Sequence, residues 1–177
     1  MGTALVTGAT SGIGEEFCWQ LAAAGHDLVL VARSEDALRA LADSLANVAG
    51  VRAEVIAADL STDSGCARVS ARLDVGGPAD REKTDLAPVD LLVNNAGFGL
   101  GTEFLDNSLE NEINGLNVMV RAVMTLAHHA GISMRSRGRG AILNVGSVAS
   151  RTGAGTYSAH KAWVVAFTEG LAAELKG

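Results

Sequence analysis

The chain has 177 residues, of which 48% are hydrophobic and 19% are charged, so it can form one domain with a substantial core but is short for two. Its formal net charge of -6 and its scattered basic residues argue against nucleic acid as a partner, and no apolar run reaches the roughly 18 residues that a membrane-spanning helix needs. Cys18 and Cys66 fit neither a disulfide framework nor a zinc site, and the first residues lack a signal-peptide pattern. These features predict a cytoplasmic protein.

Short apolar runs alternate with longer amphipathic segments along the whole chain. In chain order, the pattern predicts a strand over 3–8, a helix over 12–25, a strand over 27–33, a helix over 34–50, a strand over 51–59, a helix over 61–73, a strand over 89–97, a helix over 109–131, a strand over 140–147 and a helix over 156–177. Ser34 is the expected N-cap of the second helix, and either Ser61 or Thr62 opens the third. Gly25, Gly50 and Gly177 are the expected helix ends.

The strands show little alternation of polarity, which is typical of strands buried on both faces. A helix separates each strand from the next, so the pattern predicts a doubly wound α/β fold, a Rossmann-type parallel sheet flanked by helices, in one domain over residues 1–177. The polar segment 74–88 is rich in glycine and proline, and we expect an exposed loop there rather than a domain linker.

The segment TGATSGIG, Thr7 to Gly14, lies between the first strand and the first helix. Glycines at 12 and 14 remove side chains where a pyrophosphate has to approach the start of the helix, and the free amides and helix dipole there favour an anion. The spacing differs from the usual GxGxxG, but the strand, loop and helix context favours a dinucleotide site.

Arg33 ends the second strand, where dinucleotide enzymes choose between a ribose hydroxyl and a 2′-phosphate. A guanidinium there can hold the phosphate through charge-assisted hydrogen bonds, which favours NADP(H) over NAD(H), and Ser11 could add a hydroxyl contact. The alternative is a solvated arginine at a strand end. Arg135, Arg137 and Arg139 could also touch phosphate, although a solvated loop is the stronger interpretation.

Tyr157 and Lys161 have the i, i+4 spacing that places two side chains on one helical face. A free tyrosine ionises near pH ~10, and a cation one turn away favours its phenolate form. The pair is therefore typical of a proton donor and the cation that assists it.

Four motifs occur in a fixed order: TGATSGIG, NNAG at Asn94 to Gly97, a serine after the fifth strand, and YSAHK at Tyr157 to Lys161. In this order they resemble the short-chain dehydrogenase/reductase family in its classical form, over essentially the whole chain. The resemblance implies a cofactor site built from Thr7, Gly8, Ser11, Gly12, Ile13, Gly14, Arg33, Asp59, Leu60, Asn95, Ala96, Gly97, Tyr157 and Lys161. Asp59 would bind the adenine, and its alternative is a turn or N-cap carboxylate.

The resemblance also implies the catalytic set Asn117, Ser147, Tyr157 and Lys161. Tyr157 would be the acid/base, and Lys161 would assist it and hold the nicotinamide ribose. Ser147 would bind the substrate oxygen, with Ser150 as its competitor. Asn117 would join a proton relay, with Asn114 as its competitor. His128, His129 and His160 are interpreted as structural or surface residues, and no metal site is expected.

Two features depart from the family pattern. The segment from Ser147 to Tyr157 is shorter than its usual counterpart, and the sequence ends at Gly177, without the later strands and substrate lid of the family. The resemblance still implies an NADP(H)-dependent oxidoreductase that interconverts a carbonyl and an alcohol. The alternatives are a non-catalytic NADP-binding sensor or interaction module, or a truncated inactive form. The helices from Leu109 and from Tyr157 would form a homodimer or homotetramer interface.

Overall fold

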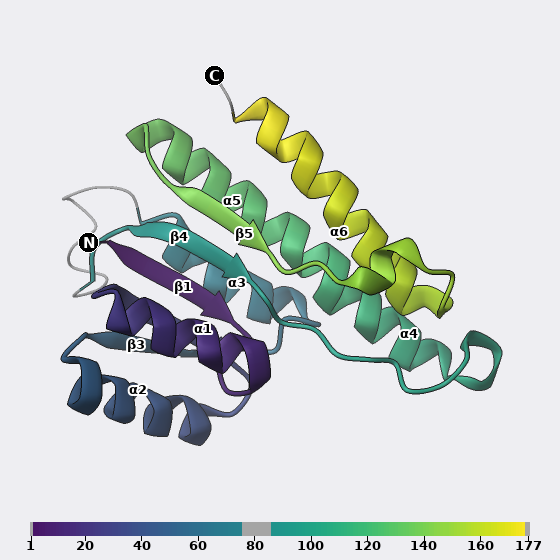
Figure 1. Ribbon diagram of the computed structural model, residues 1–177, viewed down its shortest axis with the longest axis horizontal. Coiled ribbons are helices and arrows are strands. Elements are labelled where there is room, and N and C mark those ends of the chain that lie inside the picture. The colour runs from purple at the N-terminus through teal and green to yellow at the C-terminus, as the bar shows by residue number, and fades with distance from the viewer. Residues whose placement is uncertain (1, 76–85, 176–177) are drawn as a thin grey trace.

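A 5-stranded parallel sheet forms the centre of the molecule, with strand order β3-β2-β1-β4-β5 (Figure 1). The structure is a computed structural model, and it describes residues 2–75 and 86–175. The strands are β1 (Thr3–Thr7), β2 (Asp27–Ala32), β3 (Ala53–Ala57), β4 (Val89–Asn94) and β5 (Ala141–Asn144). The predicted doubly wound α/β fold is confirmed. Most of the predicted loop over 74–88 and the predicted helix end at Gly177 lie outside the described residues.

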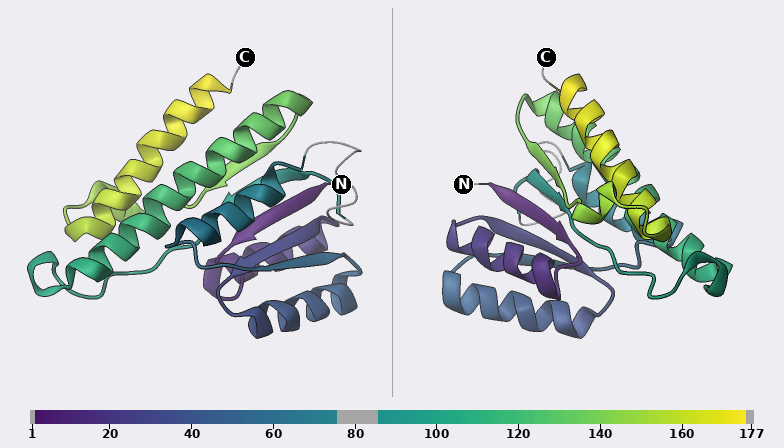
Figure 2. Two further views of the ribbon diagram at one scale, coloured as in Figure 1. Left: turned by 180° about the vertical axis from the view of Figure 1, so that it is seen from behind. Right: turned by 45° about the vertical axis from the view of Figure 1, so that its right-hand side comes forward.

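Helices cover both faces of this sheet (Figure 2). The α-helices are α1 (Gly12–Ala23), α2 (Glu35–Ala49), α3 (Asp63–Leu73), α4 (Leu109–Leu116), α5 (Ala122–Arg137) and α6 (Gly155–Glu174). Short helical segments are η2 (Phe104–Asp106), the π-helical η3 (Asn117–Arg121) and η4 (Val148–Arg151). α1 and α2 lie on one face, α3 and α5 lie on the other, and α6 packs beside β5 and η3.

Each face of the sheet has its own hydrophobic core, because side chains alternate across a strand. On one face, Val6 and Leu30 pack with Cys18 of α1 and Leu38 of α2. On the other, Leu5, Val29 and Leu92 belong to the core that α3 and α5 complete. Since β1 and β2 are buried on both faces, they carry the continuous apolar runs seen in the sequence.

Several predicted helix ends agree with the structure. The Ser34 hydroxyl accepts a hydrogen bond from the backbone N–H of Ala37 (3.3 Å), and Gly50 ends α2 in the left-handed conformation. Of the two candidates for α3, Thr62 is the N-cap, and its hydroxyl accepts from the N–H of Gly65 (3.0 Å).

The predicted helix over 109–131 is wrong in two respects. The helical path continues to Arg137 and ends at Gly138, because Gly131 lies in ordinary helical backbone and does not stop the helix. A π-helical turn also divides it, since the N–H of Ala122 donates to the carbonyl oxygen of Asn117. Such turns are frequent at functional sites.

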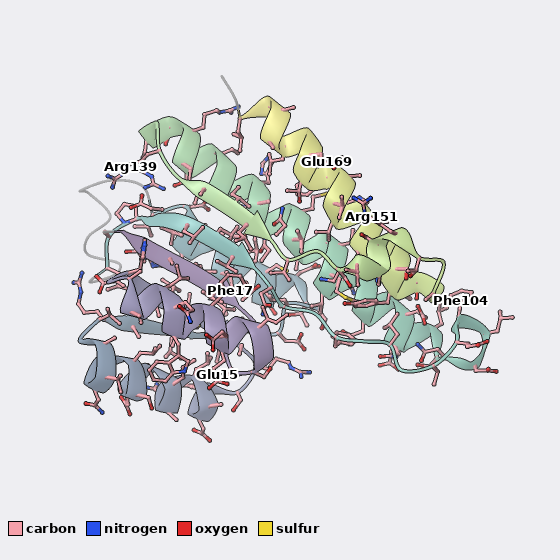
Figure 3. The ribbon with its side chains drawn as sticks, viewed as in Figure 1. Glu15, Phe17, Phe104, Arg139, Arg151 and Glu169 are labelled. Atoms are coloured by element: carbon pink, nitrogen blue, oxygen red, sulfur yellow. The ribbon has the colours of Figure 1, made fainter. Side chains whose placement is uncertain are left out.

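The arginine cluster lies at the end of the sheet where β4 begins. Arg137 donates to the Asp90 carboxylate (2.8 Å) and to the Val89 carbonyl oxygen (2.6 Å), and Arg139 also approaches Asp90. Figure 3 shows Arg139 beyond the end of α5, away from the end where Phe104 lies. Arg137 and Arg139 therefore hold the end of α5 to β4, and the phosphate contact considered for them does not fit their position at the amino end of the strand. The interpretation of a solvated loop is wrong for Arg137, which lies within α5 and pairs with Asp90.

Candidate active site

A cavity of about 620 Å³ opens beside the carboxyl ends of β1, β2, β3 and β4. Ligands of open α/β sheets bind at this edge, where the chain order of the strands reverses around β1. The cavity is lined by Gly8, Thr10, Ser11, Val31, Ala32, Arg33, Ser34, Ala58, Asp59, Leu60, Ala96, Gly97, Phe98, Asn111, Asn114 and Val118. Seven of the predicted cofactor residues thus share one cavity: Gly8, Ser11, Arg33, Asp59, Leu60, Ala96 and Gly97.

The glycine loop is shaped by close backbone contacts. Gly8 has a φ of +66°, a conformation that other residues rarely adopt. A Cβ on Gly14 would lie 2.1 Å from the Gly8 carbonyl oxygen and 2.4 Å from Asn95 Nδ2, so α1 could not start this close to β1 and β4 with any side chain there. Gly14 therefore lets the loop fold against the sheet, and it lies behind the cavity wall rather than on it.

Thr7 and Asn95 tie the glycine loop to β4. The Thr7 hydroxyl accepts hydrogen bonds from the N–H groups of Asn95 and Ala96 (both 3.0 Å), and it donates to the Val93 carbonyl oxygen (3.3 Å). Asn95 Nδ2 donates to the Thr7 carbonyl oxygen (3.0 Å). Thr7 is buried, and neither it nor Asn95 is part of the cavity lining. In this structure both residues support the cavity from behind.

A hydroxyl, a carboxylate and a guanidinium group line the rim of the cavity. Ser11 is the N-cap of α1, but its side chain makes no capping hydrogen bond, so its hydroxyl is free to meet a ligand. Asp59 accepts a hydrogen bond from the N–H of Ser61 (2.9 Å), and this bond lowers the pKa of Asp59, with smaller contributions from the Ser61 side chain and the nearby Arg33. Arg33 is exposed and supplies a cation at the end of β2.

Lys161 lies on the inner side of α6, one helical turn beyond Tyr157. It is 6% exposed, and its ammonium group donates to the Val145 carbonyl oxygen (2.8 Å) and lies 6.0 Å from the centre of the Tyr157 ring. Burial lowers the pKa of Lys161. A Cβ placed on Gly97 would lie 3.7 Å from Lys161 Nζ, so the wall of the cavity at Gly97 adjoins this ammonium group.

Ser147 follows β5 after Val145 and Gly146 and is the N-cap of η4. Its hydroxyl accepts from the N–H of Ala149 (3.1 Å) and keeps its own proton to donate. Its competitor Ser150 lies within η4, where its N–H donates to the Ser147 carbonyl oxygen (3.0 Å). Ser147 thus begins the chain segment, containing η4, that connects the sheet to α6.

Asn117 and Asn114 occupy different positions on the helix. Asn117 begins the π-helical turn, and Asn114 lines the cavity. Two residues that the motifs did not single out, Asn111 and Val118, line the same wall. The spacing 111, 114 and 118 is one helical face, so the helical period could have identified them. Gly12, Ile13, Asn117, Ser147, Tyr157 and Lys161 are not part of the cavity lining.

The described residues fit a dinucleotide. The exposed start of α1, the free Ser11 hydroxyl and the glycine loop suit a pyrophosphate, and the pair of Asp59 and Arg33 suits an adenosine end. Within the described parts of the chain, no group of three or more histidine, cysteine or acidic side chains could hold a metal ion.

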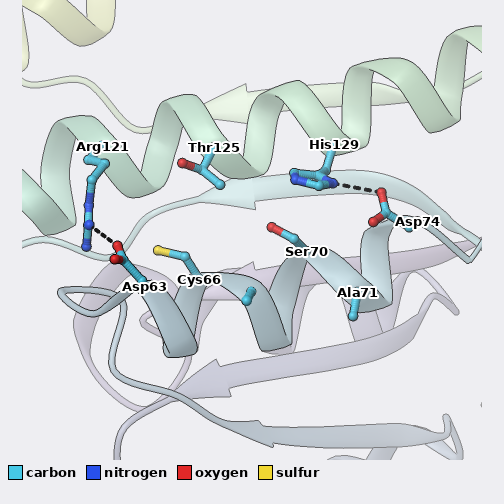
Figure 4. Close-up of a pocket in the computed structure, with 9 residues that line it drawn as sticks. Asp63, Cys66, Ser70, Ala71, Asp74, Arg121, Thr125 and His129 are labelled. Atoms are coloured by element: carbon cyan, nitrogen blue, oxygen red, sulfur yellow. Dashed lines mark hydrogen bonds and ion pairs between the residues drawn. The ribbon is translucent and has the colours of Figure 1, made fainter.

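A second hollow of about 330 Å³ lies between α3 and α5 (Figure 4). An ion pair between Arg121 and Asp63 bridges it at one end, and a hydrogen bond between His129 Nδ1 and the Asp74 carboxylate (2.8 Å) bridges it at the other. None of the predicted site residues lines it.

Among the helices described in residues 2–75 and 86–175, none has the length and apolar character needed to cross a bilayer.

Comparisons with known proteins point to one family. The family model for short chain dehydrogenases matches residues 2–177. A very-long-chain 3-oxoacyl-CoA reductase of Laccaria bicolor is 34% identical over 98% of this chain and 50% of its own length. A 7beta-hydroxysteroid dehydrogenase of Collinsella aerofaciens is 31% identical over 98% of this chain and 63% of its own length. The chain thus spans between about half and two thirds of these relatives.

Solved structures share the same fold. A short-chain dehydrogenase from Sphingobium yanoikuyae, in complex with NADPH, superposes with a TM-score of 0.89 at 35% identity and covers 99% of this chain and 66% of its own. A bulky-bulky ketone specific alcohol dehydrogenase from Comamonas testosteroni also has a TM-score of 0.89, at 34% identity, covering 99% of this chain and 68% of its own.

Proposed function

The chain belongs to the short chain dehydrogenase family, and from this premise we propose that it is an NADP(H)-dependent oxidoreductase that interconverts a carbonyl and an alcohol. The observation that carries the proposal is the buried Lys161 ammonium, 6.0 Å from the centre of the Tyr157 ring, beside the Gly97 wall of a cavity lined by the glycine loop. A buried cation near a phenol supports a role of the pair in proton transfer, since a purely structural helix face has no need of a desolvated charge.

In the proposed site, residues at the cavity rim hold the cofactor. The start of α1 and the Ser11 hydroxyl would bind the phosphates, Asp59 the adenine and Arg33 a 2′-phosphate. Asn95 and Thr7 would keep the loop in place. The NADPH complex of the related Sphingobium yanoikuyae enzyme supports a phosphorylated cofactor, and an arginine rather than an acidic residue at position 33 agrees with it.

The chain's own residues would move the proton. A bound nicotinamide dinucleotide supplies or accepts the hydride. Tyr157 gives its phenolic proton to the substrate oxygen during reduction and takes it back during oxidation. Ser147 donates a hydrogen bond to the same oxygen, and Lys161 stabilises the negative charge left on the phenol. Asn117, at the start of the π-helical turn, would continue the proton path through water to Lys161.

We also infer that two or four copies associate through α5 and α6. Met124 and Ile132 of α5 are about half exposed, and Trp163 and Phe167 of α6 form a stack with a 4.7 Å separation of ring centres. Sedimentation of the purified chain tests this point, and a monomer would contradict it.

One assay tests the activity. NADPH oxidation is measured with a panel of ketones and aldehydes that includes bulky ketones, beside cofactor binding by fluorescence. We expect turnover that Tyr157→Phe abolishes. Cofactor binding without turnover would instead favour a non-catalytic NADP-binding module, and binding of neither NADPH nor NADH would refute both.

A further inference from the structure

The first turn of α6 carries Tyr157 but lacks the usual stabilising residues of a helix start. α6 begins at Gly155, its N-cap is Ala154 without any side-chain capping bond, and its first turn holds no acidic residue. A helix start without a cap or a negative charge tends to fray, because its first N–H groups have no partner. Contacts from other elements therefore have to hold this turn.

One such contact comes from Glu112 of α4. Glu112 is 7% exposed, and its carboxylate accepts hydrogen bonds from the hydroxyl of Thr156 and from Asn107 Nδ2 (2.6 Å). A buried carboxylate is tolerated when its oxygens are hydrogen-bonded in this way. It also brings a negative charge to the first turn of α6, where the helix dipole favours one.

From Glu112 the hydrogen bonds continue to the cavity wall. Asn107 Oδ1 accepts from Asn111 Nδ2 (3.0 Å), and the same amide of Asn111 donates to the Leu100 carbonyl oxygen (3.3 Å). Asn111 lines the cavity. A continuous chain of side chains thus runs from the cavity wall through Asn107 and Glu112 to Thr156, the residue before Tyr157.

The residue after Tyr157 is held on another side. Ser158 is buried, and its hydroxyl lies 3.0 Å from the hydroxyl of Thr152, which donates to the Ala149 carbonyl oxygen (3.0 Å) of η4. Tyr157 therefore lies between two anchored neighbours. Thr156 is anchored to α4, and Ser158 is anchored to the segment that begins at Ser147.

We propose that Glu112 is a positioning residue, which holds the first turn of α6 through Thr156 and so fixes the Tyr157 ring relative to the cavity. The kinetic part of this inference rests on the proposed function, whereas the position of the ring does not. Displacement of the Tyr157 ring should lower kcat rather than weaken NADPH binding, since a shift of about 1 Å in a reacting group can lower the catalytic rate by up to about a hundred-fold.

The test uses Thr156→Val, which keeps the side-chain shape and removes the hydroxyl, and Glu112→Gln, which removes the charge at constant size. Thr156→Ser restores the hydroxyl and is the rescue variant. Glu110→Gln is the matched control, because Glu110 is an exposed carboxylate on the same helix. The chain has one tyrosine, so protein labelled with ¹³C at the tyrosine ring gives the signal of Tyr157 alone.

We expect Thr156→Val and Glu112→Gln to shift or broaden the Tyr157 ring signal and to lower kcat about ten-fold or more, with the Kd for NADPH within about two-fold of the wild type. Thr156→Ser and Glu110→Gln should leave the ring signal and kcat close to wild type. Unchanged ring signals in the first two variants would overturn the proposal, as would failure of the serine rescue or an equal effect of Glu110→Gln.

Two further outcomes also distinguish the positioning role from its alternatives. If the wild-type chain has no turnover above that of Tyr157→Phe, the proposed activity is refuted. The ¹³C signal of the Tyr157 ring in the variants then still tests the positioning role. If Thr156→Val and Glu112→Gln both lose the cooperative melting transition, Glu112 serves stability alone and the positioning role is refuted.

Discussion

Lys161 Nζ lies 6.0 Å from the centre of the Tyr157 ring and donates a hydrogen bond to the Val145 carbonyl oxygen (2.8 Å). Val145 directly follows β5, so this hydrogen bond joins α6 to the carboxyl end of the strand, and the same ammonium group lies near the predicted acid/base. Because burial lowers the pKa of Lys161, keeping this cation in the fold works against stability. A costly buried charge beside a phenol is the pattern expected of an active site.

Lys161→Met should therefore separate activity from stability. We expect turnover to fall by about a hundred-fold or more, because the cation no longer assists Tyr157. The melting temperature should stay equal or rise, since an apolar side chain of similar length replaces a desolvated ammonium group. Activity assays and thermal melts on one preparation check both parts, and a variant that keeps turnover would contradict the assigned role of Lys161.

Arg33→Asp should change the cofactor preference. A carboxylate at the end of β2 would repel a 2′-phosphate and accept a hydrogen bond from a ribose hydroxyl, so kcat/KM for NADPH should fall and that for NADH should rise. We expect the ratio of the two to shift by about a hundred-fold, as the loss of a charge-assisted pair implies. Arg151→Asp, with the same charge change at another exposed arginine, is the control. An unchanged ratio in Arg33→Asp would show that Arg33 is a solvated side chain.

Gly14→Ala should disrupt the glycine loop. The added methyl group would lie 2.1 Å from the Gly8 carbonyl oxygen, which is backbone and cannot move aside without displacing α1. We expect a loss of about 3 kcal/mol in the free energy of unfolding. Gly131→Ala is the matched control within a helix, since the atom nearest to its added methyl group is Ile142 Cδ1 at 4.0 Å, and it should stabilise α5 by about 0.5–1 kcal/mol. Equal effects in urea unfolding would contradict this explanation.

The sequence predicted the sheet and the order of its elements, because these depend on local patterns, and seven of the predicted cofactor residues line one cavity. Continuous apolar runs indicated β1 and β2. The glycine spacing was interpreted as room for a pyrophosphate, whereas the contacts of Gly14 in the structure are with the Gly8 carbonyl oxygen and Asn95 Nδ2. The ion pair between Arg137 and Asp90 could not be predicted from the sequence, because the two residues come together only through the packing of α5 on β4. The extension of α5 past Gly131 was missed for a similar reason, since tertiary packing overrides the helix-ending tendency of a glycine.

The network around Glu112 shows the same limit within the site. Glu112 resembles any acidic residue in the first turn of a helix, and its sequence position predicts a solvated side chain. Only the approach of α4 to the start of α6 buries it and supplies Thr156 as a partner. A buried polar network that joins distant segments leaves no periodic pattern, so the motif residues are predictable while the groups that hold them are not.

His160 should make the fold less stable in mild acid. Burial lowers the pKa of His160 below its ordinary value of 6.5; the nearby Glu112 partly offsets this, and Lys161 adds to it. In the unfolded chain His160 takes up a proton as the pH falls through about 6.5, while in the folded chain it stays neutral until a lower pH. The unfolded state thus binds more protons in this window, and stability falls as the pH drops from about 7 toward the folded pKa. Urea unfolding at pH 7.5 and 5.5 measures the free energy of unfolding at both pH values, and its decrease at pH 5.5 should be smaller for His160→Gln than for wild type. His128→Gln, at an exposed histidine, is the control and should show the same decrease as wild type. Identical pH dependence in wild type and His160→Gln would mean that the imidazole titrates alike in both states.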